Sequence, residues 1–164
     1  MKKKEIRVWY SEYTAITDLV PEQQEVVRAA EEASKIAYAP YSGFYVGAAV
    51  KLANGNIIKG NNQENAAYPS GICAERVAMW SAMANNLDTK IKCIAIVSVA
   101  KKTGDIIPVT PCGSCRQALL EYEMLQGKPI QVIMYTKNRM VIVFDSIANL
   151  LPMQFDGKVL KGVN

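Results

Sequence analysis

The sequence contains no histidine among its 164 residues, so a metal site built on histidine ligands is excluded. Long apolar runs are also missing, because none approaches the ~20 residues that a helix needs to cross a bilayer. The opening stretch MKKKEIRVWYSEY is basic but lacks the apolar segment of a secretory signal. We therefore expect a cytoplasmic protein with no membrane partner.

Positive charge is neither abundant nor concentrated. The net charge is +4, and the lysines are scattered apart from Lys2, Lys3 and Lys4. A nucleic-acid-binding protein more often shows a basic stripe with interleaved aromatic residues, so we expect no nucleic-acid partner. Half of the residues are hydrophobic and 21% are charged, which excludes disordered and collagen-like chains.

Hydrophobic periodicity and turn residues predict alternating strands and helices. The expected elements, in chain order, are a strand at 4–13, a helix at 21–39, a hairpin at 45–62 that turns at Asn54-Gly55, a helix at 71–86, a strand at 92–100, a helix at 113–125, strands at 130–135 and 140–144, and a short helix at 145–151 that Asp145 caps. The gap between the last two strands is too short for a crossover, so they should be antiparallel.

These elements predict an α/β fold, a three-layer α/β/α sandwich with a mixed five-stranded sheet and an extra N-terminal strand. The sequence shows no linker, repeat or low-complexity segment. We therefore expect a single domain over residues 1–164. It would comprise an N-terminal strand extension at 1–20 and a catalytic core at 21–155.

Three of the four cysteines stand at predicted helix starts. Cys112 and Cys115 are three residues apart, so one helical turn brings both sulfurs to the same end, and Cys73 opens another helix. Helix N-termini favour thiolate over thiol, and two of them at one sheet edge would surround a shared point with three thiolates. Thiolates favour zinc, and three protein ligands leave the fourth position for water, as in catalytic sites.

Alternative roles for these cysteines stay open at this point. A C-x-x-C pair alone also occurs in redox motifs and half zinc fingers. Cys93, in the apolar run KCIAIVSVA, could close a structural site as a fourth ligand, although a residue in mid-strand packs into a helix layer. The three could also be core residues, but helix starts beside Pro, Gly and Arg are poor core positions.

Glu75, two residues after Cys73, favours a catalytic site. A lone glutamate in the first turn of a helix would be explained by the helix dipole. Next to a metal ligand, its carboxylate can instead reach a zinc-bound water, take its proton and pass it to a leaving group. We therefore predict that Glu75 is catalytic.

The stretches CAER and PCGSCRQ resemble the signature of the zinc-dependent cytidine deaminases, in the variant with only cysteine ligands. NNQENAAYPSGICAER, YAPYSGFYVGAAV and LLPMQF extend the similarity to free-nucleoside deaminases, from about Tyr38 to Phe155. The ligand set is similar to that of the small homotetrameric branch, whose active sites are completed across subunit interfaces.

The resemblance implies hydrolytic deamination of cytidine or deoxycytidine to the uridine nucleoside and ammonia, with pyrimidine salvage as the setting. The enzyme would be a hydrolase acting on a cyclic amidine C–N bond of a free nucleoside. Zn²⁺ on Cys73, Cys112 and Cys115 would activate water. Glu75 would carry the proton, first to N3 of the ring and later to the departing amine.

The resemblance also implies a substrate-binding set. Asn62 and Glu64 match the pair that hydrogen-bonds the ribose hydroxyls, and Phe44 matches an aromatic residue near the nucleoside. Phe155 matches one that a neighbouring subunit contributes to the base, and Ala74 completes the set. The alternative for the first pair is loop polarity after a strand, which fits Asn61 better than Glu64. For either phenylalanine taken alone, core packing would be the simpler explanation.

Zinc with three thiolates carries a formal charge of −1, which raises the pKa of its water and calls for a nearby cation. Arg76 and Arg116 directly follow the ligand-bearing turns. The resemblance points to Arg76 as the residue that bonds the sulfurs, whereas a surface position would explain Arg116.

Two other functions stay open. A deaminase of the same fold could act on another substrate, as blasticidin deaminases and nucleic-acid editors do, but editors place a helix between their last two strands and TKNR leaves no space for one. A non-enzymatic zinc-binding interaction module would need a fourth protein ligand and would leave Glu75 without a role.

Overall fold

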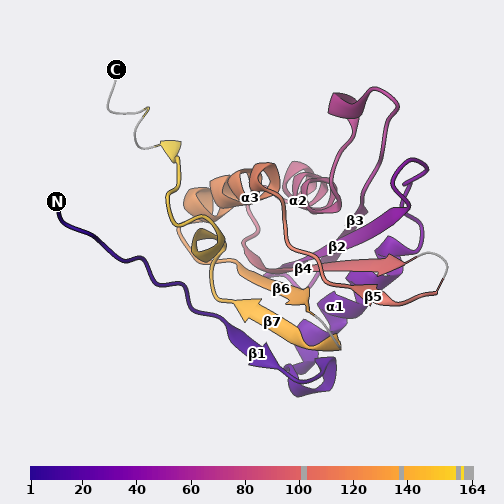
Figure 1. Cartoon of the computed structure of the whole chain (residues 1–164), viewed down its shortest axis with the longest axis horizontal. Helices are drawn as coiled ribbons and strands as arrows, with labels where there is room; N and C mark the ends of the chain where they lie inside the picture. Colours follow the sequence, from indigo (N-terminus) through magenta and orange to yellow (C-terminus); the bar gives the residue numbers. More distant parts are fainter. Residues whose placement is uncertain (101–102, 137–138, 158–159, 161–164) are drawn as a thin grey trace.

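A seven-stranded sheet lies between helices in the computed structural model, which describes all residues except 101–102, 137–138, 158–159 and 161–164 (Figure 1). The strands are β1 (Ser11–Tyr13), β2 (Phe44–Leu52), β3 (Ile57–Asn61), β4 (Ile91–Ala100), β5 (Ile106–Ile107), β6 (Gln131–Tyr135) and β7 (Val141–Phe144). The helices are α1 (Pro21–Ser34), α2 (Ala74–Asn85) and α3 (Gly113–Gln126), with short 3-10 helices η1 (Ile16–Asp18), η2 (Tyr68–Ser70) and η4 (Ile147–Leu150).

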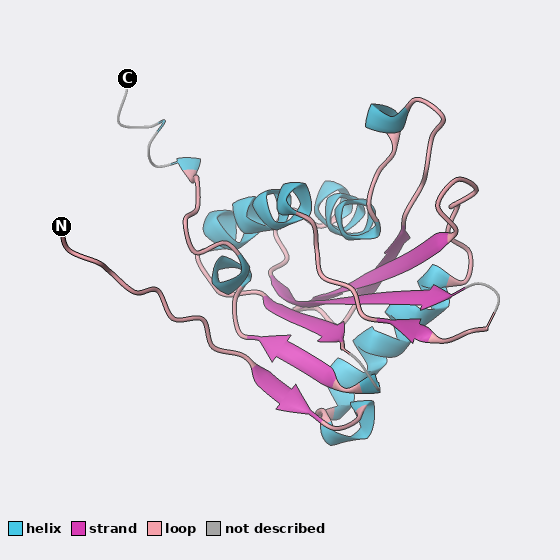
Figure 2. Ribbon diagram, in the orientation of Figure 1, coloured by secondary structure: helices cyan, strands magenta, loops and turns pink. Residues whose placement is uncertain are grey.

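The sheet is mixed and its helices form two outer layers, which confirms the predicted α/β class. Its strand order is β1-β7-β6-β4-β2-β3, with β5 paired to β4. Only the β4–β6 pair is parallel among the described strands, and β6 and β7 are antiparallel as expected. Helices α2 and α3 lie side by side on one face, and α1 covers the other (Figure 2).

The two faces of the sheet carry separate cores because successive strand residues point to opposite sides. On β4, Ile94 and Ile96 pack in the core under α2 and α3. Cys93 and Ala95 lie on the other face, in the core under α1. Cys93 therefore lies on the face of the sheet opposite to α2 and α3, the helices at whose starts the other three cysteines lie.

Small residues let two helices approach the hairpin closely. A Cβ atom on Gly47 would lie 2.0 Å from the Ala30 carbonyl oxygen of α1. A Cβ atom on Gly60 would lie 2.3 Å from the Ala78 nitrogen of α2. Gly60 therefore fixes the distance between the sheet and the helix that begins next to Cys73.

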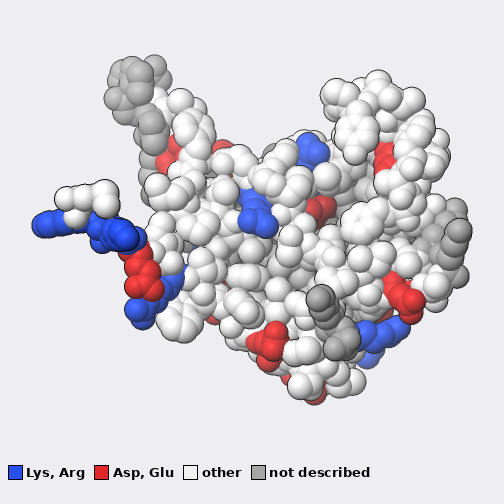
Figure 3. Space-filling view, viewed as in Figure 1, with Lys and Arg blue, Asp and Glu red and all other residues white. Residues whose placement is uncertain are grey.

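The N-terminal strand is shorter than predicted, because its partner at the sheet edge is short. The four-residue strand β7 pairs with Ser11–Tyr13, and residues 1–10 lie outside any element. Lys2, Lys3 and Lys4 lie on this exposed arm, and on the face shown in Figure 3 the other charges are interspersed. No described helix has the length and apolarity that a membrane crossing requires.

Three local expectations were wrong. Helix α1 ends at Ser34 and not at residue 39, so Ile36 is 77% exposed instead of continuing the apolar face. The hairpin does turn at Asn54-Gly55, but this pair is typical of a two-residue turn with positive φ at both positions, and among the described residues of that loop only Gly55 has a positive φ. The Leu52 N–H donates to the Asn56 carbonyl across the turn. Ser146 caps η4 by accepting from the Ala148 N–H, in the place predicted for Asp145.

The remaining difference is the number of strands. The prediction had five core strands and an N-terminal one, and the structure adds β5, which pairs with the outer end of β4 through Ser98 and Val99. A two-residue strand is too short to show the alternation of apolar and polar residues by which strands are recognised.

Candidate active site

The three cysteines at helix starts come together as the sequence predicts. Cys73 is the residue before α2, Cys112 is the residue before α3, and Cys115 lies buried in the first turn of α3. Their Sγ atoms all lie within 4.8 Å of one another. Cys93 is excluded as a fourth ligand, because it lies in the core on the opposite face of the sheet.

The sulfur cluster fits a zinc ion. Thiolate sulfur is a preferred zinc donor at about 2.3 Å, and three sulfurs this close can share one ion. Hydrogen bonds from Cys115 and Arg76 lower the pKa of the Cys73 thiol, whereas the bond to Cys73 and burial raise the pKa of the Cys115 thiol. Cys73 is therefore the member of the pair that favours the thiolate that a metal requires. The described part of the chain holds no other group of three potential ligands.

Glu75 lies beside this cluster in a dry environment. Its side chain is only 4% exposed, and burial raises the pKa of its carboxyl, assisted by the charge of Cys73. A carboxyl group with a raised pKa binds a proton more tightly than an exposed carboxyl does, and it can still return that proton to a stronger base. The start of α2 thus presents one sulfur and one buried carboxyl to the same space.

Arg76 supplies the cation that the charge argument requires. Its Nη2 donates to the Cys73 sulfur at 3.7 Å, and its guanidinium lies 5.6 Å from the centre of the Trp80 ring. The bond to Cys73 raises the pKa of Arg76, so the group stays positive. Its buried Nε has no hydrogen-bond partner among the described residues.

Arg116 is not a free surface residue. Its Nε donates to the Pro111 carbonyl at 2.8 Å, and its Nη1 donates to the Leu150 carbonyl at 3.0 Å. Both bonds go to main-chain oxygens and neither goes to a sulfur atom. Arg116 therefore holds the loop before Cys112 against η4.

A pocket of about 340 Å³ opens at the cluster. It is lined by Glu75 and Arg76 together with two of the predicted ligands and most of the predicted substrate-binding residues, which are Cys73, Cys112, Phe44, Asn62, Glu64 and Ala74. Val46, Val109 and Tyr68 add apolar surface. A pocket of mostly apolar lining with a few convergent polar groups is typical of a small-molecule site.

Asn62 is held by β2, and Glu64 is held by the loop that precedes β2. The Asn62 side chain accepts from the Val46 N–H at 2.8 Å and donates to the Phe44 carbonyl at 2.9 Å. The Glu64 carboxylate accepts from the Tyr41 N–H at 2.9 Å and from the N–H and hydroxyl of Ser42. The Ser42 hydroxyl bond is the main cause of the lowered pKa of Glu64, so this carboxylate stays ionised and can accept further hydrogen bonds.

Phe155 is the one predicted substrate-binding residue that lies outside the pocket of its own chain. Its side chain is 57% exposed and does not line the cavity. Its carbonyl oxygen accepts from Gln117 Nε2 at 2.8 Å. The predicted contribution of Phe155 to a neighbouring subunit is compatible with this position.

Several lining residues were not predicted from the sequence. Tyr41, Thr110 and Tyr68 line the pocket, and Ser42 holds Glu64. Tyr68 belongs to η2, on a loop that projects from the body in Figure 1. The only signal was their place inside or next to the motifs, in YAPYSGF, TPCGSC and NAAYPSG.

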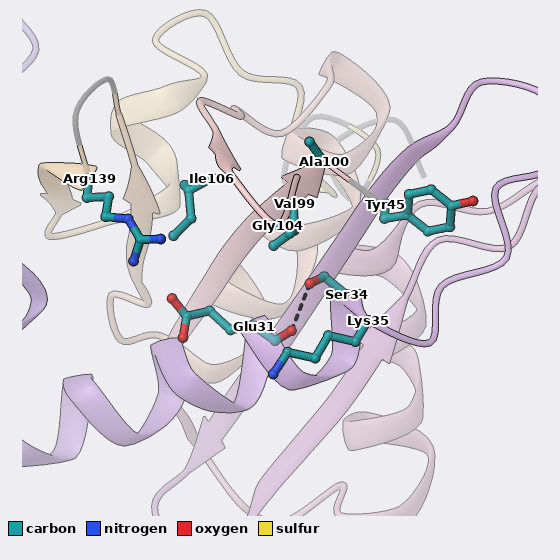
Figure 4. Close-up of a pocket in the computed structure, with 9 residues that line it drawn as sticks. All are labelled: Glu31, Ser34, Lys35, Tyr45, Val99, Ala100, Gly104, Ile106 and Arg139. Atoms are coloured by element: carbon teal, nitrogen blue, oxygen red, sulfur yellow. Dashed lines mark hydrogen bonds between the residues drawn. The ribbon is translucent and has the colours of Figure 1, made fainter. Parts of the chain in front are cut away.

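A second cavity of about 380 Å³ lies on the α1 side of the sheet (Figure 4). Its charged lining consists of Glu31, Lys35 and Arg139, and the Glu31 carboxylate accepts from the Tyr135 hydroxyl at 3.0 Å. None of the cysteines, all of which are described, lines it. The cavity at the sulfur cluster is therefore the candidate active site.

The layered fold and the sulfur cluster define an α/β protein with a metal site at the starts of two helices. Residues 20–127 match the family model of the cytidine and deoxycytidylate deaminase zinc-binding region. This match covers more than half of the chain, so the protein belongs to the cytidine and deoxycytidylate deaminase family. The match begins after the N-terminal arm and β1.

Individual relatives agree with the family. A cytidine deaminase from Halalkalibacterium halodurans is 40% identical over 100 residues, which are 61% of this chain and 71% of that protein. The crystal structure of a cytidine deaminase from Burkholderia pseudomallei superposes with a TM-score of 0.66 at 38% identity, over 80% of this chain and 97% of that one. A cytidine deaminase structure from Mycobacterium tuberculosis gives a TM-score of 0.62 at 30% identity, over 80% of this chain and 95% of that one.

Proposed function

We propose that this chain hydrolyses cytidine and deoxycytidine to uridine and deoxyuridine and releases ammonia. The observation that carries this function is the group of three sulfur atoms within 4.8 Å of one another, next to the buried carboxyl of Glu75 in a pocket of nucleoside size. The relatives named cytidine deaminase support the same activity. The ribose-binding pair and the pocket volume favour a free nucleoside over a polymer.

The ligands of the metal would be Cys73, Cys112 and Cys115. When it is bound, zinc supplies Lewis acidity that lowers the pKa of a water molecule. Arg76 offsets the excess negative charge of three thiolates through its bond to Cys73. The two helix N-termini add partial positive charge from their free N–H groups.

Glu75 moves the protons. Its carboxylate takes one proton from the attacking water and delivers it to N3 of the pyrimidine while oxygen bonds to C4. It then takes the remaining hydroxyl proton and gives it to the amine, so that ammonia leaves C4 and the carbonyl forms. Burial raises the pKa of Glu75, so its carboxylate binds a proton from water more readily than an exposed carboxylate would.

Asn62 and Glu64 bind the sugar. The Asn62 side chain is already fixed by two main-chain bonds, and Glu64 by three hydrogen bonds, so both are oriented before the substrate arrives. An ionised Glu64 accepts from ribose hydroxyls, which are donors. Phe44 and Ala74 line the walls against which the nucleoside packs.

We also propose a homotetramer in a cytoplasmic setting. Phe155 is exposed and outside its own pocket, which supports a role for its ring in a neighbouring copy. Pyrimidine salvage is the process in which such an activity operates. The assembly is tested by sedimentation or light scattering on the zinc-loaded protein.

Turnover of cytidine with and without a chelator tests the function. The zinc-loaded protein should change the absorbance of cytidine to that of uridine and release an equal amount of ammonia. Chelation should abolish both, and added zinc should restore them. Cytosine without its sugar should be a much poorer substrate, because Asn62 and Glu64 would have nothing to bind. Zinc-loaded protein without turnover on any of the nucleosides would contradict the proposal.

An interaction module without catalysis is the remaining alternative from another class. It requires a closed site with four protein ligands. Only three sulfurs form the cluster in the described part of the chain, and the fourth cysteine lies beyond the sheet. A closed site would also leave a buried carboxyl next to the metal without a role, so we do not favour this alternative.

A further inference from the structure

The two residues after Cys115 connect the sulfur cluster to the C-terminal segment. Arg116 donates to the carbonyl of Leu150, and Gln117 donates to the carbonyl of Phe155. Arg116 also donates to the Pro111 carbonyl, just before Cys112. One turn of α3 thus carries a predicted metal ligand and holds both ends of the segment 150–155.

The N-terminal end of the segment 150–155, at Leu150, is firmly fixed. The buried carboxylate of Glu123 accepts from the Ile130 N–H at 2.8 Å, from the Ile147 N–H at 2.9 Å and from the Ser146 hydroxyl. These bonds attach η4 to α3 and to the start of β6. Leu150, at the end of η4, is therefore a rigid point from which the chain departs.

The position of the C-terminal end of the segment 150–155, at Phe155, depends on Gln117. Beyond Leu151, the bond from Gln117 to Phe155 is the only hydrogen bond to residues 152–155 in the part of the chain that the structure describes. This bond holds the main-chain oxygen of Phe155 and does not involve its ring, and Phe155 is 57% exposed. Met153 is exposed as well, so packing does not replace this bond.

We propose that Gln117 is a positioning residue that sets the place of Phe155 for the active site of a neighbouring copy of this chain. The inference rests on the proposed function and on the exchange of Phe155 between copies. The sulfur-bearing turn of one subunit then determines how the base is held in the next one. Arg116 supports the same segment at its base.

The consequence is a defect in binding that appears in another subunit. Stacking of an aromatic ring on a base contributes to the ground state and the transition state alike, so its loss raises KM and leaves kcat nearly unchanged. A misplaced Phe155 should raise the KM for cytidine by about fivefold or more. Zinc content should not change, because Gln117 donates to no sulfur.

Gln117→Glu tests this role with little change of shape, since a carboxylate cannot donate to the Phe155 carbonyl. Glu121→Gln, on an exposed position of the same helix, is the matched control. We expect a raised KM, an unchanged kcat and full zinc for Gln117→Glu, and wild-type values for the control. If the wild type turns over cytidine, the inference would be overturned by a Gln117→Glu variant that loses zinc, that shows a fall in kcat alone, or that keeps the wild-type KM.

Mixed oligomers test the exchange between subunits. Tagged Gln117→Ala subunits assembled with a large excess of Glu75→Gln subunits should show a wild-type KM, because every working site receives Phe155 from an intact neighbour. Tagged wild-type subunits in an excess of subunits carrying both substitutions should show the raised KM. The reverse pattern, or a monomeric enzyme, would overturn the inference while leaving the deaminase function standing. Absence of turnover in the wild-type holoenzyme would overturn the function and this inference with it.

Discussion

Arg76 donates from Nη2 to the sulfur of Cys73 at 3.7 Å, so a cation contacts one of the three predicted metal ligands directly. The two residues lie one turn apart at the start of α2, where the helix presents both to the same space. A site made only of thiolates is more negative than one that contains neutral ligands. The contact therefore bears on how strongly the bound metal can polarise water.

Substitution of Arg76 tests this balance of charge. Arg76→Ala should lower kcat/KM for cytidine by about 10- to 100-fold while zinc remains bound, because partners outside the ligand shell commonly have effects of that size. Arg28→Ala, an exposed arginine of α1 on the other face of the sheet, is the control. Full turnover in Arg76→Ala would refute the charge argument.

Glu75 is tested by its neutral isostere. Glu75→Gln should reduce kcat by about 10²- to 10⁴-fold, the usual contribution of a positioned proton carrier. The zinc content and the thermal midpoint should stay close to wild type, since the amide fills the same space. An active Glu75→Gln enzyme would show that another group moves the protons.

The close approach of α2 to the hairpin gives a prediction about folding and metal binding. Gly60→Ala places a methyl group 2.3 Å from the Ala78 nitrogen, so helix α2 must shift, and with it Cys73 and Glu75. We expect a loss of stability of about 1–3 kcal/mol, as for other overpacked sites, together with weaker zinc binding. Urea unfolding and a competition assay with a metal indicator measure the two effects.

Gly47→Ala is the matched control on the opposite face. Its methyl group would meet the Ala30 carbonyl oxygen and the Ser34 nitrogen of α1. Stability should fall in this variant too, but the zinc affinity of the folded protein should be unchanged. Equal effects of both substitutions on zinc affinity would show that α2 is not specifically placed by Gly60.

Because Cys93 is buried, we expect the protein to lose stability in alkaline solution. Burial raises the pKa of its thiol from 9.0 to about 12, whereas the unfolded chain ionises near the ordinary value. The folded state then holds a proton that the unfolded state has released, so stability is constant below the unfolded pKa and falls between 9.0 and about 12. One such proton gives a slope of about 1.4 kcal/mol per pH unit.

Cys93→Ala isolates this contribution. As pH rises from about 8 to about 10.5, the unfolding free energy of the wild type should fall relative to that of the variant. Tyr135, whose pKa burial also raises, contributes to the total slope but cancels in the comparison. A difference that is independent of pH would show that Cys93 is not buried as the structure has it.

Much of this architecture could be predicted because its signals are local. The helical period of Val26, Val27 and Ala30 gave α1, and the two thiols in one turn with Cys73 at another helix start gave the metal site. The end of α1 and the exposure of Ile36 could not be predicted, since apolar residues continue past Ser34. The short β1 was also hidden, because its length is set by β7, 128 or more residues later.

Contacts between distant segments account for the rest of what was missed. Tyr41 and Ser42 bind Glu64 through their main-chain N–H groups, and Ser42 also through its hydroxyl, and no local sequence pattern reveals bonds between residues so far apart in the chain. Ser146 caps η4 in preference to its neighbour Asp145, and the buried carboxylate of Glu123 holds Ser146 from α3. Such choices depend on which segment packs nearby.

X-ray absorption at the zinc edge of the loaded enzyme tests the central claim most directly. The account predicts three sulfur neighbours at about 2.3 Å and one lighter neighbour, oxygen or nitrogen, in the position open to water and substrate. Four sulfur neighbours would contradict it, because a closed site has no place for the reacting water.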